Sequence, residues 1–445
     1  MGQHVAIVGG GFSGAMLAVH LLRLGSRVTL VERKGDPGRG LAYGAADPIH
    51  LLNVRAGNMS AYPDAPAHFA EWLGERGVAN AAPTFAARRV FGDYIEEQLA
   101  SATSGAADRF THIQDDAVDI ETGGRGAAVS LGGGSSLQAD AAVLALGNLP
   151  PPAPPGIDPA RLPPGAFFAD PWAPGAAAGL TGQDEVLVVG TGLTMVDIVL
   201  LLEARGFTGP IVALSRRGLV PLPHGDDPPT ADRRSSAPAA LDSALVRELR
   251  ERAAAIPWRH AVDELRPFTQ QLWHVAPLHQ RRRFVRHLRP WWDIHRHRIA
   301  PEVHARIQSL IRSGRLRVGA GKLLSATAGG AGVAVHWRPR GSDAPEGMTF
   351  SRIINCTGPE ADLGRSREPL LRRLLDRGAI RPGPIGLGID VDGGARVLDA
   401  TGTANPRLLA LGPLTRGMWW EIIAVPDIRS QVADVAASLS RQEQP

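Results

Sequence analysis

The chain has 445 residues, 44% of them hydrophobic, which suits two or three domains with large cores and excludes wholesale disorder. The formal net charge is only +4, and the basic residues are almost all arginines, because Lys34 and Lys322 are the only lysines. Since nucleic-acid binding needs basic residues gathered on one face, this composition supports it poorly, and we expect no nucleic-acid partner.

The first part of the chain predicts a strand, a glycine turn, a helix and a second strand within residues 1–34. The elements expected next are an ordered loop over 35–66, helices over Phe69–Leu73 and Val90–Leu99, a buried strand over 139–148 and a proline-rich linker over 150–155.

A second strand, glycine turn, helix and strand begin near Glu185. The elements expected after it are a polar loop from Arg217 to about Ala240, a helical insert over about 241–313, strands over Leu316–Val318, Val333–Trp337, Arg352–Cys356 and Arg407–Leu411, and a last helix from Pro426 to about Leu439. Similar strand ends at Gly147 and Gly358 suggest two units, each closed by a strand and a glycine. Because the chain after Gly358 has no glycine fingerprint of its own, the second unit is expected to be inserted into the first.

Cys356 is the only cysteine, which excludes an intrachain disulfide, and its apolar strand predicts that the thiol is buried. The first residues lack the basic segment of a signal peptide. No stretch approaches about 18 uninterrupted apolar residues, the length of a membrane span. We therefore expect a cytoplasmic protein with no membrane partner.

The first fingerprint is Gly9-x-Gly11-x-x-Gly14, between an apolar strand and a helix. Its glycines allow a tight turn, backbone approach to a pyrophosphate and close packing of helix on strand. Glu32 follows about 18 residues later, where a carboxylate accepts hydrogen bonds from ribose hydroxyls. Neighbouring cofactor-binding candidates are Phe12, Ser13 and Arg33.

The second fingerprint keeps Gly190 and Gly192 but has Met195 at its third position. Its following strand ends in basic rather than acidic residues, and paired arginines can hold a 2′-phosphate by charge-assisted hydrogen bonds. We therefore expect NADPH here, with NADH the weaker candidate; a unit that binds no nucleotide stays open as an alternative. The candidates of this unit are Leu193, Thr194, Ser215, Arg216 and Arg217.

Four motifs extend the pattern beyond the fingerprints: Gly38–Gly44 with His50–Val54, Gly190–Asp197, Arg286–Arg298 and Leu411–Gly417. Together they resemble a family of bacterial FAD/NAD(P)-binding proteins, over essentially the whole chain. This family is similar to the two-dinucleotide-binding flavoproteins that include the N-hydroxylating and Baeyer–Villiger monooxygenases.

The resemblance implies FAD in the first unit and NAD(P)H in the second. It places Gly412 and Pro413 near the isoalloxazine, and it points the last helix at the flavin's pyrimidine edge, where negative charge develops on reduction. The other residues that it implies in cofactor binding are Arg39, Leu41, Ala42, Asn53, Val54, Val118, Gly147 and Gly358.

We therefore predict an α/β fold with two Rossmann-like dinucleotide-binding domains in a glutathione-reductase-like arrangement. The expected bounds are 1–165 for the first part of the FAD domain, 183–358 for the NAD(P)H domain with its helical insert, and 359–445 for the part that completes the FAD domain.

Two departures from the motifs of related flavoproteins reduce the number of reactions that the chain could catalyse. The segment Phe167–Trp172 lacks the central histidine that Baeyer–Villiger and related enzymes carry there, which weakens those activities. The chain also has no cysteine pair, and Leu411-Gly412 is not followed by the aspartate of disulfide reductases, so that chemistry is excluded.

Catalytic candidates come from two segments rich in tryptophan: Trp291, His295 and His297 of the insert, and Trp420 and Glu421 after the last strand. The insert residues line either a substrate and nicotinamide cleft or an ordinary core with a solvated arginine face. Glu421 is either a base or a capping residue, and Trp420 either faces substrate or packs in the core. Arginines repel cations and no cysteine lies nearby, so no metal site is expected.

The favoured function is a flavin monooxygenase that uses NAD(P)H and oxygenates a small N or S nucleophile through a C4a-(hydro)peroxyflavin. A reductase or dehydrogenase without productive use of O2, and a flavin-binding protein without catalysis, stay open as alternatives. The expected partners are a small-molecule substrate and O2, and a homo-oligomer is possible.

Overall fold

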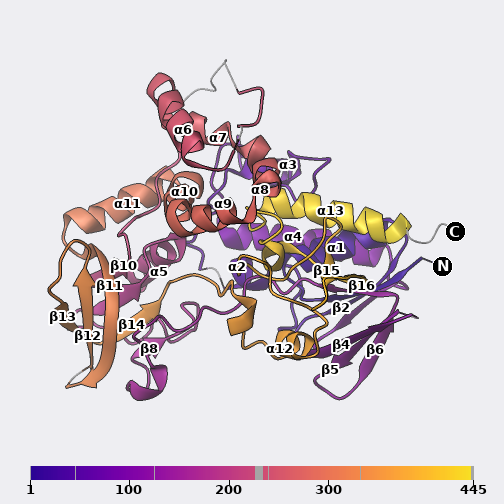
Figure 1. Ribbon diagram of the computed structural model, residues 1–445, viewed down its shortest axis with the longest axis horizontal. Coiled ribbons are helices and arrows are strands. Elements are labelled where there is room, and N and C mark those ends of the chain that lie inside the picture. The colour runs from indigo at the N-terminus through magenta and orange to yellow at the C-terminus, as the bar shows by residue number, and fades with distance from the viewer. Residues whose placement is uncertain are drawn as a thin grey trace.

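A computed structural model describes residues 2–45, 47–124, 126–225, 234–238, 240–330 and 332–441. Its two large sheets lie side by side, and a group of helices bridges them at the top of Figure 1.

The first sheet has six strands in the order β15-β16-β7-β1-β2-β3. All pair in parallel except the edge strand β15. Their bounds are β1 His4–Val8, β2 Arg27–Val31, β3 Phe110–Ile113, β7 Ala141–Leu144, β15 Arg396–Leu398 and β16 Ala404–Ala410. The sheet therefore takes strands from both ends of the chain. Chain order changes direction between β1 and β7, the place where open α/β sheets bind ligands.

Three helices cover one face of this sheet: α1 (Phe12–Arg23), α4 (Arg88–Ser104) and α13 (Val425–Arg441). In Figure 1 the yellow α13 runs beside α1 and α4. The other face packs on a small antiparallel sheet of β4 (Ala117–Gly123), β5 (Gly126–Leu131) and β6 (Ser136–Ala139), and on α12 (Pro369–Asp376).

The second sheet has seven strands in the order β13-β12-β11-β10-β9-β14-β8. Its bounds are β8 Phe167–Phe168, β9 Val186–Val189, β10 Ile211–Ser215, β11 Leu316–Gly329, β12 Gly332–Pro339, β13 Glu346–Phe350 and β14 Arg352–Asn355. Helices α5 (Leu193–Ala204) and α11 (Pro301–Arg312) share an apolar core with it.

The helical insert joins this sheet to the first unit. Its elements are α6 Ser243–Ala255, α7 Trp258–Asp263, a 3-10 turn Arg266–Phe268, α8 Thr269–Val275, α9 Leu278–Arg283, a π-helix Phe284–Leu288 and α10 Arg289–Arg296. Trp273 and Phe284 of the insert form a core with Trp420, which follows the last strand of the first sheet. The insert therefore rests on the segment between β16 and α13.

The predicted α/β fold with two Rossmann-like units is confirmed, and so is the burial of Cys356, which is 5% exposed. The domain bounds stay a prediction. Of the expected polar loop from Arg217 to Ala240, residues 226–233 and 239 lie outside the described residues. Within the described residues, no helix combines the length and the apolar character that crossing a bilayer requires.

Two predicted strands differ from the structure. The strand expected over 139–148 is divided at Asp140, whose carboxylate accepts the backbone N–H of His4 at 2.7 Å and ties down the start of β1. The strand expected over Leu316–Val318 extends to Gly329 as β11, because residues 316–320 pair with β10 and residues 321–329 pair with β12.

Candidate functional site

The first glycine turn requires glycine at two positions. Gly9 has a φ of +105°, and a Cβ there would lie 2.5 Å from the carbonyl oxygen of Ala145. A Cβ at Gly14 would lie 1.9 Å from the carbonyl oxygen of Gly9, so only glycine lets α1 approach β1 this closely. No side chain caps α1 at Gly11, which leaves the first N–H groups of the helix to bind an anion.

Glu32 and Arg33 directly follow β2 but have different surroundings. The carboxylate of Glu32 accepts the N–H of Gly10 at 2.6 Å and that of Lys34 at 3.0 Å, so it is fixed at the edge of the turn. Arg33 instead pairs with Glu368 at 2.6 Å and with Asp116 at 3.0 Å, and the hydrogen bond that it donates to Glu368 raises the pKa of the guanidinium. Ribose binding by Glu32 stays a prediction, whereas Arg33 holds neighbouring loops together.

The predicted cofactor-binding residue Val118 lies two residues after Asp116, half-buried in β4. Because Arg33 bonds Asp116, this start of β4 is held beside the end of β2. That is the end of the sheet at which Glu32 lies.

The loop after β2 folds over the first glycine turn. The N–H of Gly38 donates to the carbonyl oxygen of Gly10 at 2.7 Å, and a Cβ at Gly40 would lie 2.9 Å from the Cα of Gly11. Arg39 points away from the turn and pairs with Glu96 at 2.6 Å and with Asp93, both on α4. The next two candidates, Leu41 and Ala42, are exposed.

The ends of β16 and β7 complete this side of the turn. Gly412 donates its N–H to Gln431 at 2.8 Å, and a Cβ there would lie 2.7 Å from the hydroxyl of Ser13, so Gly412 and Pro413 meet the start of α1. Phe12, next to Ser13, is buried against Phe91. Nothing lies within 4 Å of a Cβ built on Gly147, so the space beside the end of β7 is open. These strand ends fit a dinucleotide.

Asn53 and Val54 lie where the two units meet. The carbonyl oxygen of Asn53 is 2.9 Å from Nε2 of His224, in the segment that follows β10. Val54 packs on the core of the first unit. Burial lowers the pKa of His224, which favours the neutral ring at this junction.

The second glycine turn has the same geometry. Gly190 has a φ of +118°, and a Cβ there would lie 2.2 Å from the carbonyl oxygen of Cys356. Gly192 precedes α5 without a side-chain cap, and nothing lies within 4 Å of a Cβ at Gly192 or Gly358. Leu193 and Thr194, the first residues of α5, are half-buried. The start of α5 is therefore free for an anionic group.

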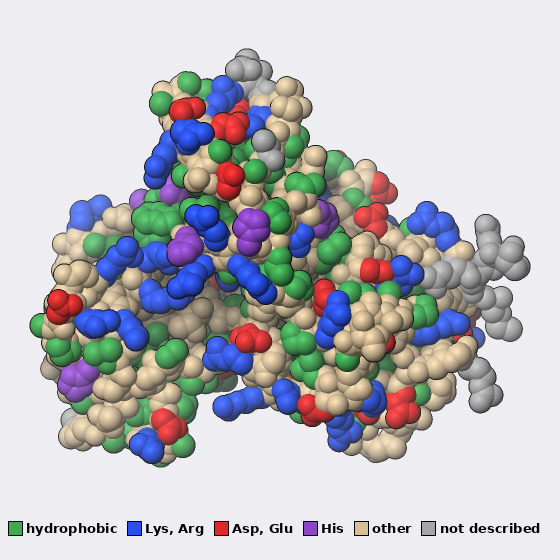
Figure 2. All heavy atoms as spheres, in the orientation of Figure 1, with side chains coloured by type: hydrophobic (Ala, Val, Ile, Leu, Met, Phe, Trp, Pro, Cys, Tyr) green, Lys and Arg blue, Asp and Glu red, His purple; other side chains and the backbone are tan. Residues whose placement is uncertain are grey.

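At the end of β10, one side chain is held by hydrogen bonds in the turn, and the two that follow it have no partner among the described residues. The hydroxyl of Ser215 accepts the N–H of Gly218 at 3.0 Å and lies 2.8 Å from the hydroxyl of Thr191, so it shapes the turn. Arg216 is exposed and Arg217 half-buried, and neither makes a hydrogen bond or ion pair with any described residue. Figure 2 shows Lys and Arg side chains gathered below the insert, between the two sheets.

A buried cluster of charges lies where α10 meets the segment after β16. The carboxylate of Glu421 accepts the indole N–H of Trp292 at 2.6 Å, pairs with Arg296 at 3.0 Å and lies 3.6 Å from Nε2 of His297. Glu421 is 3% exposed and has a φ of +58°, a conformation that costs about 1 kcal/mol or more for a residue other than glycine. We call these four residues with Asp293 and Arg416 the Glu421 cluster.

Protonation in this cluster follows from burial and charge. Burial alone raises the pKa of Glu421, but His297, Arg296 and Trp292 together bring it below the usual value. Burial lowers the pKa of His297, which keeps the imidazole neutral. Among the described residues, no group of three or more His, Cys, Asp and Glu side chains could hold a metal ion.

Of the five catalytic candidates, only His297 and Glu421 belong to the Glu421 cluster. Trp420 is 2% exposed and stacks on Trp273, with ring centroids 4.7 Å apart. Trp291 is 47% exposed, and His295 bonds the Trp291 carbonyl oxygen at 2.8 Å on the same side of α10. A role for these three in catalysis stays a prediction.

Sequence reasoning missed Trp292, Arg296 and Arg416. Trp291 and His295 are four residues apart, and so are Trp292 and Arg296, so helical spacing defines two possible faces of α10 equally well. Only contact with Glu421 selects the second face. The quoted motif therefore contained these residues but no signal that distinguished them.

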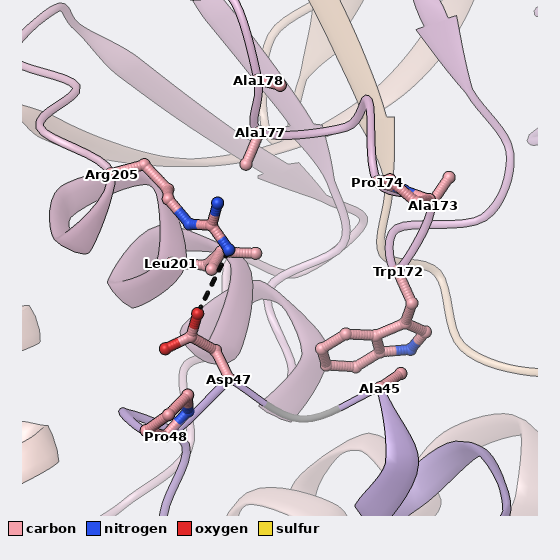
Figure 3. A pocket seen from close by; sticks show the side chains of 10 residues that line it. All are labelled: Ala45, Asp47, Pro48, Trp172, Ala173, Pro174, Ala177, Ala178, Leu201 and Arg205. Carbon is pink, nitrogen blue, oxygen red and sulfur yellow. Dashed lines mark hydrogen bonds and ion pairs between the residues drawn. The ribbon is translucent and has the colours of Figure 1, made fainter.

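A cavity of about 260 Å³ lies elsewhere, between the loop Ala45–Pro48 and α5 (Figure 3). The side chain of Arg205 points across it to Asp47, 3.3 Å away, and Trp172 lies opposite. Arg205 follows the C-terminal end of α5, about 18 Å along a 12-residue helix from Gly192, where helix carbonyls repel anions. This cavity therefore lies at the opposite end of α5 from the second glycine turn.

Two glycine turns on two sheets define a two-dinucleotide-binding flavoprotein fold. Residues 6–149 match the FAD-NAD(P)-binding family model, so this part of the chain is an FAD/NAD(P)-binding domain. Among curated protein sequences, none matches the chain.

Solved structures share the fold over its full length. Ornithine N-hydroxylase from Kutzneria sp. 744, solved with reduced FAD, NADP+ and L-ornithine, is 17% identical, with a TM-score of 0.68 and 100% of both chains covered. L-lysine 6-monooxygenase from Pseudomonas syringae is 17% identical, with a TM-score of 0.69 and 100% of both chains covered. Thioredoxin reductase from Lactococcus lactis is 11% identical, with a TM-score of 0.57 and 99% of both chains covered.

Proposed function

We propose that this protein is an FAD-dependent monooxygenase that takes electrons from NADPH and oxygenates a small substrate at a nitrogen or sulfur atom. The observation that carries the proposal is the contrast between the two turns. The first has a fixed carboxylate at Glu32, and the second has two arginines, Arg216 and Arg217, that pair with no described residue. A ribose suits the former, and a 2′-phosphate suits the latter.

The choice between oxygenation and dithiol chemistry depends on cysteine. The fold is shared with N-hydroxylases and with thioredoxin reductase. Cys356 is the only cysteine, is buried in the second unit, and has a pKa raised by burial, so the thiolate is disfavoured. A buried thiol without a partner cysteine cannot form an intrachain disulfide, which favours the oxygenase class.

In this proposal Glu32, Ser13 and Gly412 hold FAD at the first turn, and Arg216 with Arg217 holds the 2′-phosphate of NADPH at the second. Bound FAD supplies the chemistry that passes electrons from NADPH to O2. The chain's own task is to place both nucleotides and to keep water from the reacting atoms. Stacked Trp420 and Trp273, buried between insert and first unit, form a dry wall for that purpose.

The Glu421 cluster suggests different roles for its acid and its base. Both carboxylate oxygens of Glu421 are engaged, one by Trp292 and one by Arg296, and its pKa is low, so we assign it to positioning the insert. Nε2 of His297 is buried without a hydrogen bond, and the ring is neutral. His297 is therefore the residue we propose to accept a proton.

Turnover under isotopically labelled O2 tests the proposal. The FAD-loaded protein, NADPH and a panel of amines, thiols and thioethers should give a product that carries one labelled oxygen atom, with NADPH consumed in proportion. A stoichiometric yield of hydrogen peroxide with every member of the panel would contradict oxygenation and favour a reductase. Absence of flavin reduction by either pyridine nucleotide would contradict both enzymatic functions.

A further inference from the structure

Arg416 is a buried cation that has no hydrogen-bond or ion-pair partner among the described residues. It follows the 3-10 turn Gly412–Thr415 at the end of β16 and is 9% exposed. Its guanidinium carbon lies 4.6 Å from the ring centroid of Trp420. No described residue forms a hydrogen bond or an ion pair with its side chain.

The carboxylates around Arg416 are already engaged by other arginines. Glu421 pairs with Arg296 at 3.0 Å and Asp293 with Arg289 at 3.4 Å, and these are the two carboxylates that act on Arg416 electrostatically. Each of these two carboxylates thus has an arginine of its own, and Arg416 is a third arginine that pairs with no described carboxylate. His297 adds no positive charge, because its burial favours the neutral ring.

A buried guanidinium in this state is costly, since removing an ion from water costs several kcal/mol unless an opposite charge compensates it. Burial lowers the pKa of Arg416 to about 10, so the side chain stays protonated at neutral pH. Two buried donors beside one another lack an acceptor: Nε of Arg416 and Nε1 of the Trp420 indole. Two donors and an unpaired positive charge are what an anion requires.

The surroundings select the kind of anion. Asp293 and Glu421 both act on Arg416 electrostatically, and their negative charges disfavour a dianion such as phosphate. In the proposed function, the phosphates of NADPH are bound in the second unit, by Arg216, Arg217 and the start of α5. The planar guanidinium matches a carboxylate, which carries a single charge and two oxygens.

We propose that Arg416, with the indole N–H of Trp420, is a binding site for a carboxylate group of the substrate, beside the end of β16. The assignment of that carboxylate to a substrate rests on the proposed function. The site itself rests on the burial and missing partner of Arg416. It limits the substrate class to molecules with a carboxylate and, at some distance from it, a nitrogen or sulfur nucleophile.

Calorimetric titration of the FAD-loaded protein without NADPH tests the site. The probes are acetate, butyrate and benzoate, their primary amides, inorganic phosphate and adenosine 2′,5′-bisphosphate. We expect the carboxylates to bind and the amides not to, with affinity reduced about tenfold or more in Arg416→Met and partly retained in Arg416→Lys. The matched control is Arg312→Met, at the exposed end of α11, which should bind carboxylates as the unchanged protein does.

Thermal unfolding separates binding from folding. Because Arg416→Met removes an unpaired buried charge, its midpoint without ligand should equal or exceed that of the unchanged protein. Carboxylates should raise the midpoint of the unchanged protein and leave that of Arg416→Met where it was. A lower midpoint in Arg416→Met, together with undiminished carboxylate binding, would mean that Arg416 is structural and would overturn the proposal.

Three further results would overturn it: amides that bind as well as carboxylates, phosphate or adenosine 2′,5′-bisphosphate preferred over them, or a flavin spectrum changed by Arg416→Met while carboxylate binding is unchanged. The last would pair Arg416 with the flavin. None of these measurements needs turnover. Carboxylate binding without any oxygenated product would therefore refute the proposed function alone, and oxygenation without Arg416-dependent binding would refute this site alone.

Discussion

The guanidinium of Arg88 and the carboxylate of Asp197 form a two-point contact across the junction of the two units, at 2.8 and 3.0 Å. Arg88 begins α4 of the first unit, and Asp197 lies in α5, the helix of the second glycine turn. His50, which is fully buried, bonds the carbonyl oxygen of Asp197 at 3.0 Å. This contact fixes the start of α5 against the first unit.

Asp197→Asn should therefore destabilise the protein by about 3 kcal/mol, because it leaves the Arg88 charge buried without its partner. NADPH should also reduce the flavin more slowly, since α5 is less firmly placed. Urea unfolding measures the first effect, and rapid mixing without O2 measures the second. In a double-mutant cycle, Arg88→Met with Asp197→Leu should cost less than the sum of the single changes. Additive losses would show that the two side chains do not act together.

We expect the arginine pair after β10, Arg216 and Arg217, to decide which nicotinamide nucleotide is preferred. Replacing Arg216 and Arg217 by alanine should weaken NADPH binding by about 1–3 kcal/mol and leave NADH binding nearly unchanged, because only NADPH has a 2′-phosphate. Calorimetry with both nucleotides checks this. Arg340→Ala, an exposed arginine after β12 of the same unit, is the matched control. Equal losses for the two nucleotides would refute the phosphate assignment.

Neighbouring residues at the end of β2 should differ in their effect on FAD. Glu32→Gln replaces a carboxylate that accepts two backbone N–H groups by a group with one acceptor oxygen, so FAD affinity should fall about tenfold. Arg33→Ala should leave FAD affinity nearly unchanged, because Arg33 is engaged by Asp116 and Glu368. Release of FAD, followed by flavin fluorescence, compares the two. An equal loss in Arg33→Ala would show that Arg33 contacts the cofactor.

The glycine turns, both second strands and the α/β class could be predicted from local sequence, because turn geometry, strand burial and helix packing each restrict residue type over a few positions. Gly9 and Gly14 illustrate this, since neither tolerates a Cβ. The Glu421 cluster could not be predicted in the same way. Trp292 and Glu421 are 129 positions apart, and only the docking of α10 on the segment after β16 brings them together.

A comparison of two arginines shows the same limit of prediction from local sequence. Arg39 and Arg416 both lie in glycine-rich loops beside the first unit, but Arg39 is paired with α4 carboxylates, whereas Arg416 pairs with none of the residues that the structure describes. Nothing in their local sequence separates them, because the partners come from distant parts of the chain. Residue type thus predicts what a side chain can bind, and tertiary packing decides whether it remains available.

Lowering the pH should destabilise the protein through His297 and Glu421. Both groups have folded-state pKa values below their ordinary values of 6.5 and 4.5. Near these pH values the unfolded chain therefore binds more protons than the folded protein, and stability falls as the pH is lowered. The His297 contribution is present above about pH 6.5 and is lost as pH falls through its lower folded pKa. His297→Gln should therefore lose less stability than the unchanged protein between about pH 7 and pH 5. Urea unfolding across this range, with exposed His279→Gln as control, measures the difference, and parallel losses in all three proteins would contradict it.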